Sequence, residues 1–329
     1  MSCRRKECWH GTAERNKLRV PNNACRLACL KTTCAVPIKI FGEVLFDHFP
    51  NGATVLGGAP FNVAWHLHAF GQSPCFISRI GLDAEGESVI KAMQAWEMNY
   101  SELQLDNHYP TGAVQISFKQ DEPCYQILTD QAYDFISVPD GSKFGAGSLL
   151  YHGTLALRNE VSRQALQNIK SQHQGKVFLD VNLREPWWRK DEILQWLGEA
   201  DWVKLNREEF QALQPDLSDM IVAMKYFRQT HDLEGLIVTC GEQGAYAINM
   251  TGEQAKVVPD ATVMVIDSVG AGDAFSAIAM LGIYLDWPLP LIMERAQLFA
   301  SAMVGRQGAT VQDKAFYQTF LASWLVGSG

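Results

Sequence analysis

The segment Asp267-Ser-Val-Gly-Ala-Gly-Asp273 combines the residue types best suited to chemistry. It lies between a β-branched run, Val263–Ile266, which predicts a strand, and a periodic apolar run, Ala274–Leu285, which predicts a helix. Gly270, Ala271 and Gly272 would let a ligand approach the backbone where that helix begins. Free N–H groups and the positive end of the helix dipole converge there, so the segment predicts an anion hole.

Asp273 needs a separate explanation because its carboxylate would compete with an anion for such a site. A general base that takes the proton of an acceptor hydroxyl, beside a phosphoryl group held by the N–H groups, resolves the conflict. The alternative is a helix cap, since Asp is favoured at N-caps and in first turns. The sequence has no Gly-x₄-Gly-Lys-Ser/Thr motif and no protein-kinase motif set, which excludes those two kinase classes.

Alternating strand-like and helix-like segments must position this site. Buried apolar runs predict strands at Ile38–Phe41, Cys75–Ser78, Leu149–His152, Lys176–Val181, Asp201–Leu205, Leu236–Thr239 and Ala245–Asn249. Helical patterns occupy Pro60–Phe70, Glu85–Met98, Asn159–Gln172 and Asp219–His231. This order predicts an α/β fold over residues 37–329, with a mostly parallel central sheet between two layers of helices.

One region departs from the alternation and predicts a small β lid. In Thr111–Lys119, Val114, Ile116 and Phe118 share one side, and Cys124–Leu128 follows after a turn to form a hairpin. The stretch Glu43–Leu56 is also too long for a simple loop between strand and helix. We therefore expect lid segments near residues 43–56 and 107–135, which could close over a site or pack against a second subunit as a homodimer.

The charge distribution separates a basic leader from an acidic body. Residues 1–37 carry eight Lys or Arg and two Glu, a net +6, and because the whole chain carries −8 the remainder carries −14. An acidic body argues against nucleic-acid binding, and no apolar run of about 18 residues predicts a membrane span. Three scattered cysteines in apolar surroundings, Cys75, Cys124 and Cys240, suit a reducing compartment and predict a cytoplasmic location.

The leader, residues 1–36, holds the other five cysteines, at spacings that match no zinc motif. It has no long apolar region typical of a secretory signal. Its Arg content is compatible with a transit peptide, but it has little Ser and no amphipathic period. A disordered extension, or sequence upstream of the true start, is the interpretation we favour.

Two motifs resemble those of the PfkB (ribokinase-like) carbohydrate kinases. Asp267–Asp273 is similar to the family's C-terminal signature, Asp-Thr-x-Gly-Ala-Gly-Asp, and Gly57–Ala64 followed by Phe70-Gly71 resembles the N-terminal signature. The resemblance extends from about Ile38 to Thr310. It is strongest to the fructokinase branch, through segments at Gly42–Asp47, Gly57–Pro60, Asp180–Arg184 and Lys204–Glu209. It implies a ribokinase-like α/β fold that transfers the γ-phosphoryl of ATP to a sugar hydroxyl, with Asp273 as the base.

The resemblance also implies residues for the sugar. Asp47 matches a family Asp that binds sugar hydroxyls, and its two oxygens suit polyol recognition. Gly58 and Asn62 match positions that contact the sugar through a backbone N–H and a side-chain amide; as an alternative, Asn62 could satisfy its own backbone. Gln115, or Tyr125, is a candidate contact from the lid. Arg184 matches a position that could stabilise phosphate charge, although a surface ion pair with Glu185 or Asp191 would also explain it.

A third group would hold ATP and its ions. Asn182 follows a strand end, and Asn206 and Glu209 match the family's Asn-x-x-Glu motif, in which the Glu organises Mg²⁺ through water. Glu208 is the adjacent rival. Thr239, Gly241 and Gly244 resemble the nucleotide-binding edge, although glycines there are also ordinary turn residues. Asp267 matches a position that helps to bind a monovalent cation, which makes it a candidate K⁺ ligand.

The leading expectation is a fructokinase that uses MgATP, with Asp273 and the anion-hole residues 270–272 at its centre. Another ketose, ribose, a sugar acid or a nucleoside remains an alternative acceptor. A catalytically silent relative would be expected to lose the base or the glycines, and both are present. A dinucleotide-binding oxidoreductase would need Gly-x-Gly-x-x-Gly after the first strand, where the sequence has Gly-Glu-Val.

Overall fold

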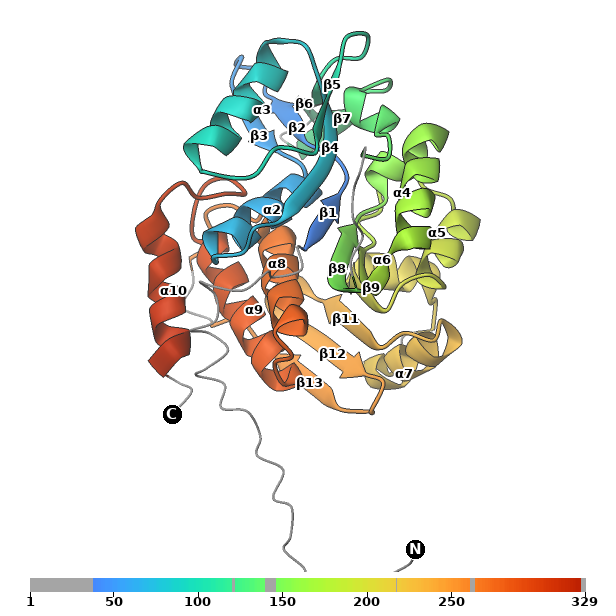
Figure 1. The fold of residues 1–329 in the computed structure, drawn as a ribbon. Coiled ribbons are helices and arrows are strands. Elements are labelled where there is room, and N and C mark those ends of the chain that lie inside the picture. Colours follow the sequence, from blue (N-terminus) through green and yellow to red (C-terminus); the bar gives the residue numbers. More distant parts are fainter. Residues whose placement is uncertain (1–37, 120–121, 140–145, 217, 261–263, 327–329) are drawn as a thin grey trace, which may run out of the picture.

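A nine-stranded sheet forms the centre of the protein (Figure 1). The computed structural model describes residues 38–119, 122–139, 146–216, 218–260 and 264–326, so the leader lies outside the described residues. In spatial order the strands are β13 (Gln254–Val257), β12 (Ala245–Asn249), β11 (Gly235–Thr239), β10 (Trp202–Asn206), β9 (Gln174–Asp180), β8 (Ala146–His152), β1 (Lys39–Phe41), β4 (Cys75–Gly81) and β5 (Leu103–Asp106).

The strands from β11 to β5 run parallel, and β12 and β13 are antiparallel additions at one edge. This confirms the predicted parallel α/β architecture. Because parallel strands have their carboxyl ends at the same edge, the loops after β1, β9, β10 and β11 gather on one side of the sheet.

Helices cover both faces of the sheet (Figure 1). One face packs against α2 (Ala59–Ala69), α3 (Ala84–Ala95), α8 (Ala271–Tyr284), α9 (Leu289–Val304) and α10 (Lys314–Val326). The other packs against α4 (Glu160–Gln172), α5 (Lys190–Leu197), α6 (Arg207–Leu213) and α7 (Met220–Thr230). Short 3₁₀ turns are η2 (Ala132–Phe135), η3 (Leu155–Arg158) and η4 (Gly241–Gln243).

The two helical layers explain why the central strands are apolar on both sides. Ile40 and Phe178 belong to the core beneath α2 and α8, whereas the adjacent Phe41 and Leu179 belong to the core beneath α4 and α5. Successive side chains of a strand point to opposite faces, so both faces of the sheet are buried. The sheet therefore provides a rigid base for the loops at its carboxyl edge.

A separate four-stranded sheet forms the lid. Its order is β3 (Thr54–Gly57), β2 (Leu45–His48), β6 (Gly112–Lys119) and β7 (Glu122–Ile127). It joins both predicted lid segments, and β2 pairs with β6 in parallel. The predicted apolar side is buried at Val114 and Ile116, but Phe118, at the far end of β6, is 56% exposed.

Two boundaries differ from expectation. The predicted strand Val263–Ile266 is not formed in its described part, because residues 264–266 make no ladder and their side chains are exposed. The second lid segment is shorter than 107–135, because η2 packs against β4 and its Tyr133 is fully buried. Over the ranges given above, every helix is too short or too polar to cross a lipid bilayer.

Candidate active site

Helix α8 begins at the carboxyl edge of the sheet with a glycine in a left-handed conformation. Gly270 is the N-cap, with φ +77°, and a Cβ on it would collide with Ala309. Only glycine accepts both conditions without strain. The N-cap therefore has no side chain to bond the first N–H groups, which favours an anion there.

Asp273 lies in the first turn of α8, three residues after that N-cap. Its Oδ2 accepts a hydrogen bond of 2.8 Å from the Asn62 side-chain amide, which comes from helix α2. The carboxylate is thus bonded across the site to another helix, and a cap role does not account for that contact. Asn62 itself is 3% exposed and its Oδ1 has no protein partner, so the amide is held mainly through Asp273.

The surroundings of Asp273 raise the pKa of its carboxyl above the ordinary value of 3.8. Burial raises the pKa of its carboxyl to about 6, and Asp180 adds to the rise. The Asn62 hydrogen bond and the positive charges of Lys204 and Arg184 oppose it. A carboxylate with this pKa is ionised at pH 7 yet basic enough to accept a hydroxyl proton in a transition state.

Arg184 acts electrostatically on two carboxylates, those of Asp47 and Asp273. Asp47 is in β2 of the lid, and burial raises the pKa of its carboxyl. The guanidinium of Arg184, which follows β9, opposes that rise in Asp47 and also opposes it in Asp273. Arg184 is therefore close to both carboxylates. Its two predicted surface partners are engaged elsewhere, since Glu185 accepts from Trp188 and Asp191 from Arg189.

Gly58 lets the backbone fold tightly beside this group. It has φ +106°, and a Cβ on it would lie 2.8 Å from the carbonyl oxygen of Glu43. Its conformation starts helix α2 and so sets the direction in which Asn62 points. The N-terminal motif Gly57–Ala64 thus places Asn62 against Asp273, and a Cβ on Gly57 would lie 4.0 Å from Oδ2 of Asp47.

Gln115 does not join these residues. The strand register puts Asp47 opposite Val114, and Gln115 opposite His48 on the other face of the lid. The Gln115 side chain is exposed and contacts Nδ1 of His48 at 3.1 Å. His48 in turn contacts Glu85 of α3 at 2.6 Å. Gln115 therefore belongs to a contact between lid and body. Tyr125 shares the face of Asp47.

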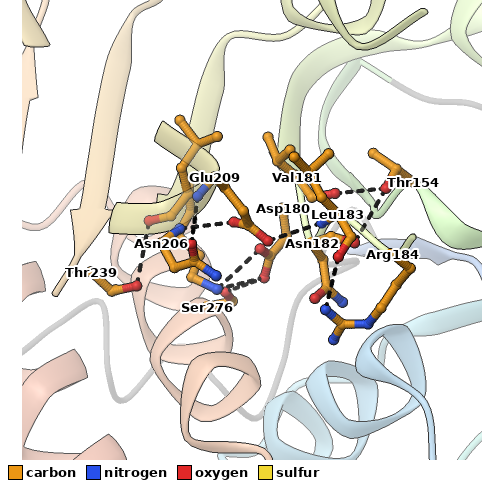
Figure 2. Close-up of polar contacts among 12 residues, drawn as sticks. Thr154, Asp180, Val181, Asn182, Leu183, Arg184, Asn206, Glu209, Thr239 and Ser276 are labelled. Atoms are coloured by element: carbon orange, nitrogen blue, oxygen red, sulfur yellow. Dashed lines mark hydrogen bonds and ion pairs between the residues drawn. The ribbon is translucent and has the colours of Figure 1, made fainter. Parts of the chain in front are cut away.

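The Asn-x-x-Glu motif forms a capping box in this structure (Figure 2). Asn206 Oδ1 accepts from the N–H of Glu209, and Glu209 Oε2 accepts from the N–H of Asn206, both at 2.8 Å. The second oxygen of Glu209, Oε1, accepts from the N–H of Leu183 at 2.9 Å. Glu209 is 7% exposed and ties the loop after β9 to the start of α6. Both oxygens have protein partners, whereas the rival Glu208 is exposed.

The predicted nucleotide-binding residues lie at the carboxyl ends of neighbouring strands. Asn206 of β10 and Thr239 of β11 are direct register partners, and Thr239 Oγ1 donates to the Leu205 carbonyl oxygen at 3.4 Å. Asn182, with φ +43°, follows β9. Beyond β11, a Cβ on Gly241 would meet nothing within 4 Å, whereas one on Gly244 would collide with the Val257 carbonyl. Gly241 is therefore open to a ligand, and Gly244 is required by the turn.

Asp267 holds the segment before α8 in place. Its Oδ1 accepts from the N–H of Val269 at 2.9 Å, and its Oδ2 accepts from the N–H of Gly308 at 3.0 Å. Among the described residues, no three His, Cys, Asp or Glu side chains gather as metal ligands. The carboxylates of Glu209 and Asp267 fit ions that are bound largely by phosphate and water oxygens, as Mg²⁺ often is in kinases.

The sequence did not single out three buried polar residues that lie at the first turns of α8. Asp180 and Lys204 are partners on β9 and β10, with Lys204 Nζ 3.0 Å from Asp180 Oδ1. Ser276 of α8 donates to Asp180 Oδ2 at 2.7 Å (Figure 2). The sequence feature that could have revealed them is a lysine between Val203 and Leu205 in an apolar strand. A lysine is rarely buried without a partner, so its position indicates a buried counter-charge.

Comparison with known proteins agrees with this arrangement. The pfkB family carbohydrate kinase pattern matches residues 39–315. A fructokinase of Salmonella typhimurium is 28% identical over 256 residues, which cover 72% of this chain and 81% of the relative. A fructokinase of Klebsiella pneumoniae is 29% identical over 261 residues, which cover 75% and 84%.

Solved structures share the fold. The fructokinase of Vibrio cholerae O395, with fructose, ADP and calcium ion bound, has a TM-score of 0.71 at 23% identity, covering 87% of this chain and 99% of that one. The aminoimidazole riboside kinase of Salmonella enterica, with aminoimidazole riboside and an ATP analogue, has a TM-score of 0.76 at 23% identity, with the same coverage. With the parallel sheet, the β lid and the glycine-started helix α8, the family match shows that the chain belongs to the pfkB family of carbohydrate kinases.

Proposed function

We propose that this carbohydrate kinase transfers the γ-phosphoryl group of MgATP to a hydroxyl of D-fructose, with Asp273 as the general base. The observation that carries the proposal is the Asp273 carboxylate, which lies in the first turn of α8 and is fixed by Asn62 at 2.8 Å. It is thus beside the start of a helix, where the N–H groups of Gly270 and Gly272 can hold a phosphoryl group.

The proposed chemistry is an in-line transfer. Asp273 takes the proton of the attacking hydroxyl as the new oxygen–phosphorus bond forms, and ADP leaves with the electron pair of the broken bond. The N–H groups of residues 270–272 and the dipole of α8 face the negative charge on the transferred group. Mg²⁺, when bound with ATP, would neutralise charge on the phosphate oxygens, with Glu209 contributing through water.

Acceptor recognition is assigned to residues around Asp47. Its carboxylate can accept from two hydroxyls of a sugar, and the backbone N–H of Gly58 and the amide of Asn62 are assigned as further sugar contacts. Arg184 is an exposed charged group that follows β9, suited to phosphate oxygens. D-Fructose is the leading acceptor because two curated relatives are fructokinases and a solved neighbour was obtained with fructose bound. On the nucleotide side, Asn182, Asn206, Thr239, Gly241 and Gly244 are assigned to ATP, and Asp267 to K⁺.

The lid also supports a proposed homodimer. By register, Val55, Phe118 and Tyr125 lie on the lid face that carries Asp47, and they are 40%, 56% and 58% exposed. An exposed apolar strip continuous with the site suits the lid of a second copy. Sedimentation velocity should show a dimer that Phe118→Asp dissociates. Leu105→Asp, on an exposed apolar residue of β5, is the control and should leave the dimer intact.

A substrate panel tests the function. ADP release should be measured with fructose, other ketoses, ribose, sugar acids and nucleosides, each with MgATP and with KCl or NaCl. Fructose is expected among the best acceptors, with faster turnover in KCl, and Asp273→Asn should reduce kcat by several orders of magnitude while ATP binding persists. A strong preference for another acceptor would change the assignment, and near-normal turnover of Asp273→Asn would exclude the base.

A further inference from the structure

Lys204 carries a positive charge in the interior of the protein. It is 6% exposed, in a strand whose neighbouring residues Val203 and Leu205 are fully buried. Its Nζ lies 3.0 and 3.1 Å from the two oxygens of Asp180, and the second oxygen also accepts from Ser276 at 2.7 Å. Burial alone would lower the pKa of Lys204, but the carboxylates of Asp180, Glu209 and Asp273 outweigh burial and raise it.

This ammonium group lies directly beneath the start of α8. A Cβ built on Gly272 would be 3.2 Å from Lys204 Nζ. Gly272 is the residue before Asp273, so the charge is adjacent to the same first turn that forms the anion hole. The Asp180–Lys204 pair thus connects β9 and β10 of the sheet with α8, and Ser276 completes the connection one helical turn further along (Figure 2).

Stability alone does not account for such a pair. Desolvating two charges is costly, and apolar residues of similar volume often replace a buried ion pair without loss of stability. The strand around Lys204 is otherwise apolar, so a packed apolar pair would suit its surroundings. A charge kept here therefore points to a role in the adjacent site.

We propose that Lys204, held by Asp180, is a positioning residue that supplies a fixed positive charge beneath the first turn of α8. This inference rests on the proposed function, because it assigns Lys204 an effect on the base Asp273 and on the anion hole. Lys204 does not touch the acceptor. Its charge favours the ionised form of Asp273, and the carboxylate of Asp180 acts on Asp273 in the opposite direction.

The two partners should therefore act in opposite directions on the pH profile of kcat/KM. Lys204→Met removes the positive charge and leaves Asp180 beside the base, so the acidic limb should move up by about one pH unit, as expected for loss of a nearby opposite charge. Asp180→Asn leaves Lys204 without its counter-charge, and the limb should move to lower pH. The double variant is neutral at the pair and should return the limb close to that of the unmodified enzyme.

The experiment compares these variants with Lys204→Arg, which keeps the charge, and with Lys176→Met, which breaks a surface pair with Glu234. In both variants the acidic limb of kcat/KM should stay at the pH found for the unmodified enzyme. Circular dichroism and thermal unfolding identify variants that do not fold; if Lys204→Met is one, Asp180→Asn and the double variant still carry the test. The proposal would be overturned if the acidic limb of the kcat/KM profile stays in place in both single variants, or moves in the same direction in both.

Asp273→Asn separates this inference from the proposed function. If Asp273→Asn is inactive and the limb of Lys204→Met does not move, the base stands and the role of Lys204 is wrong. If Asp273→Asn retains turnover, the proposed base is wrong, whatever Lys204 does.

Discussion

The side-chain amide of Asn62 donates to Oδ2 of Asp273 at 2.8 Å, although 211 residues separate them in the sequence. This bond joins the two family motifs, since Asn62 lies in Gly57–Ala64 and Asp273 ends the Asp267–Asp273 segment. It fixes one oxygen of the proposed base. The N-terminal motif therefore contributes to orienting the proposed base.

Removing this bond should impair chemistry more than sugar binding. Asn62→Ala frees the Asp273 carboxylate to rotate and removes a hydrogen bond that lowers its pKa. We expect kcat to fall by roughly 10- to 100-fold, because misplaced catalytic groups lose much of their effect, and the acidic limb of kcat/KM to move to higher pH. Steady-state kinetics from pH 5 to 8 measure both. If only KM for the sugar rises, Asn62 is a sugar contact and does not orient the base.

Activity should increase as pH rises through about 6. The pKa of Asp273 is raised by burial to about 6, so the carboxyl is protonated and inactive as a base below that pH and ionised above it. The profile of kcat/KM reports this pKa for the free enzyme. A profile that stays flat down to pH 5 would show that Asp273 titrates lower or is not the base.

The glycines of the anion hole should respond differently to alanine. Gly272→Ala places a methyl group 3.2 Å from Lys204 Nζ and should lower kcat by about 10-fold while leaving the fold intact. Gly270→Ala puts a side chain at φ +77° against Ala309 and should destabilise the protein by 1 kcal/mol or more, as is roughly expected for left-handed backbone.

Urea unfolding and kcat together distinguish these effects. Gly305→Ala is the matched control, because its φ is −77° and its Cβ would have only ordinary contacts, at 3.7 Å and beyond. It should change neither quantity. Full activity of Gly272→Ala would show that the space above Lys204 is not needed for the reaction.

The sequence predicted the layers of the fold well, because the spacing of apolar residues and the positions of turn residues are local signals. The parallel order and Asp273 at the start of a helix follow from such signals. Phe118 shares its side with Val114 and Ile116 as predicted, but it is exposed. Alternation shows which side chains share a face, but not how far the body covers that face. The 263–266 run was read as a strand from its β-branched residues, yet no ladder partner is present at residues 264–266. Strand formation depends on a neighbour that propensity does not reveal.

Contacts in the site could be predicted from the sequence only where the residue types and their local spacing indicate the same interaction. Asn206 and Glu209 have the spacing of a capping box, and that local reading accounts for their bonds. The Asp180–Lys204 pair depends on two strands lying in register, which no local pattern reports. Gln115 was assigned to the sugar, but the register places it with His48. The partners of these residues therefore depend on contacts between elements, which local sequence patterns do not show.

Glu43 provides a test of stability against pH. It follows β1, is 3% exposed, and its Oε2 has no protein partner. Burial raises the pKa of its carboxyl to about 7 from an ordinary 4.5, with Arg184 and Arg158 opposing and Asp273 adding to the rise. The folded protein therefore holds this proton over a pH range in which the unfolded chain releases it.

The sign of the effect follows from that difference. The stability that neutral Glu43 contributes is complete below pH 4.5 and is lost as pH rises through about 7. The total loss is about 3 kcal/mol for a shift of this size. Glu43→Gln keeps the shape of the acid without the titration. Urea unfolding at pH 5 and pH 8 should show the variant gaining stability relative to the unmodified protein at the higher pH. Equal differences at both pH values would mean that Glu43 is ionised in the folded protein, with its charge balanced by the two arginines.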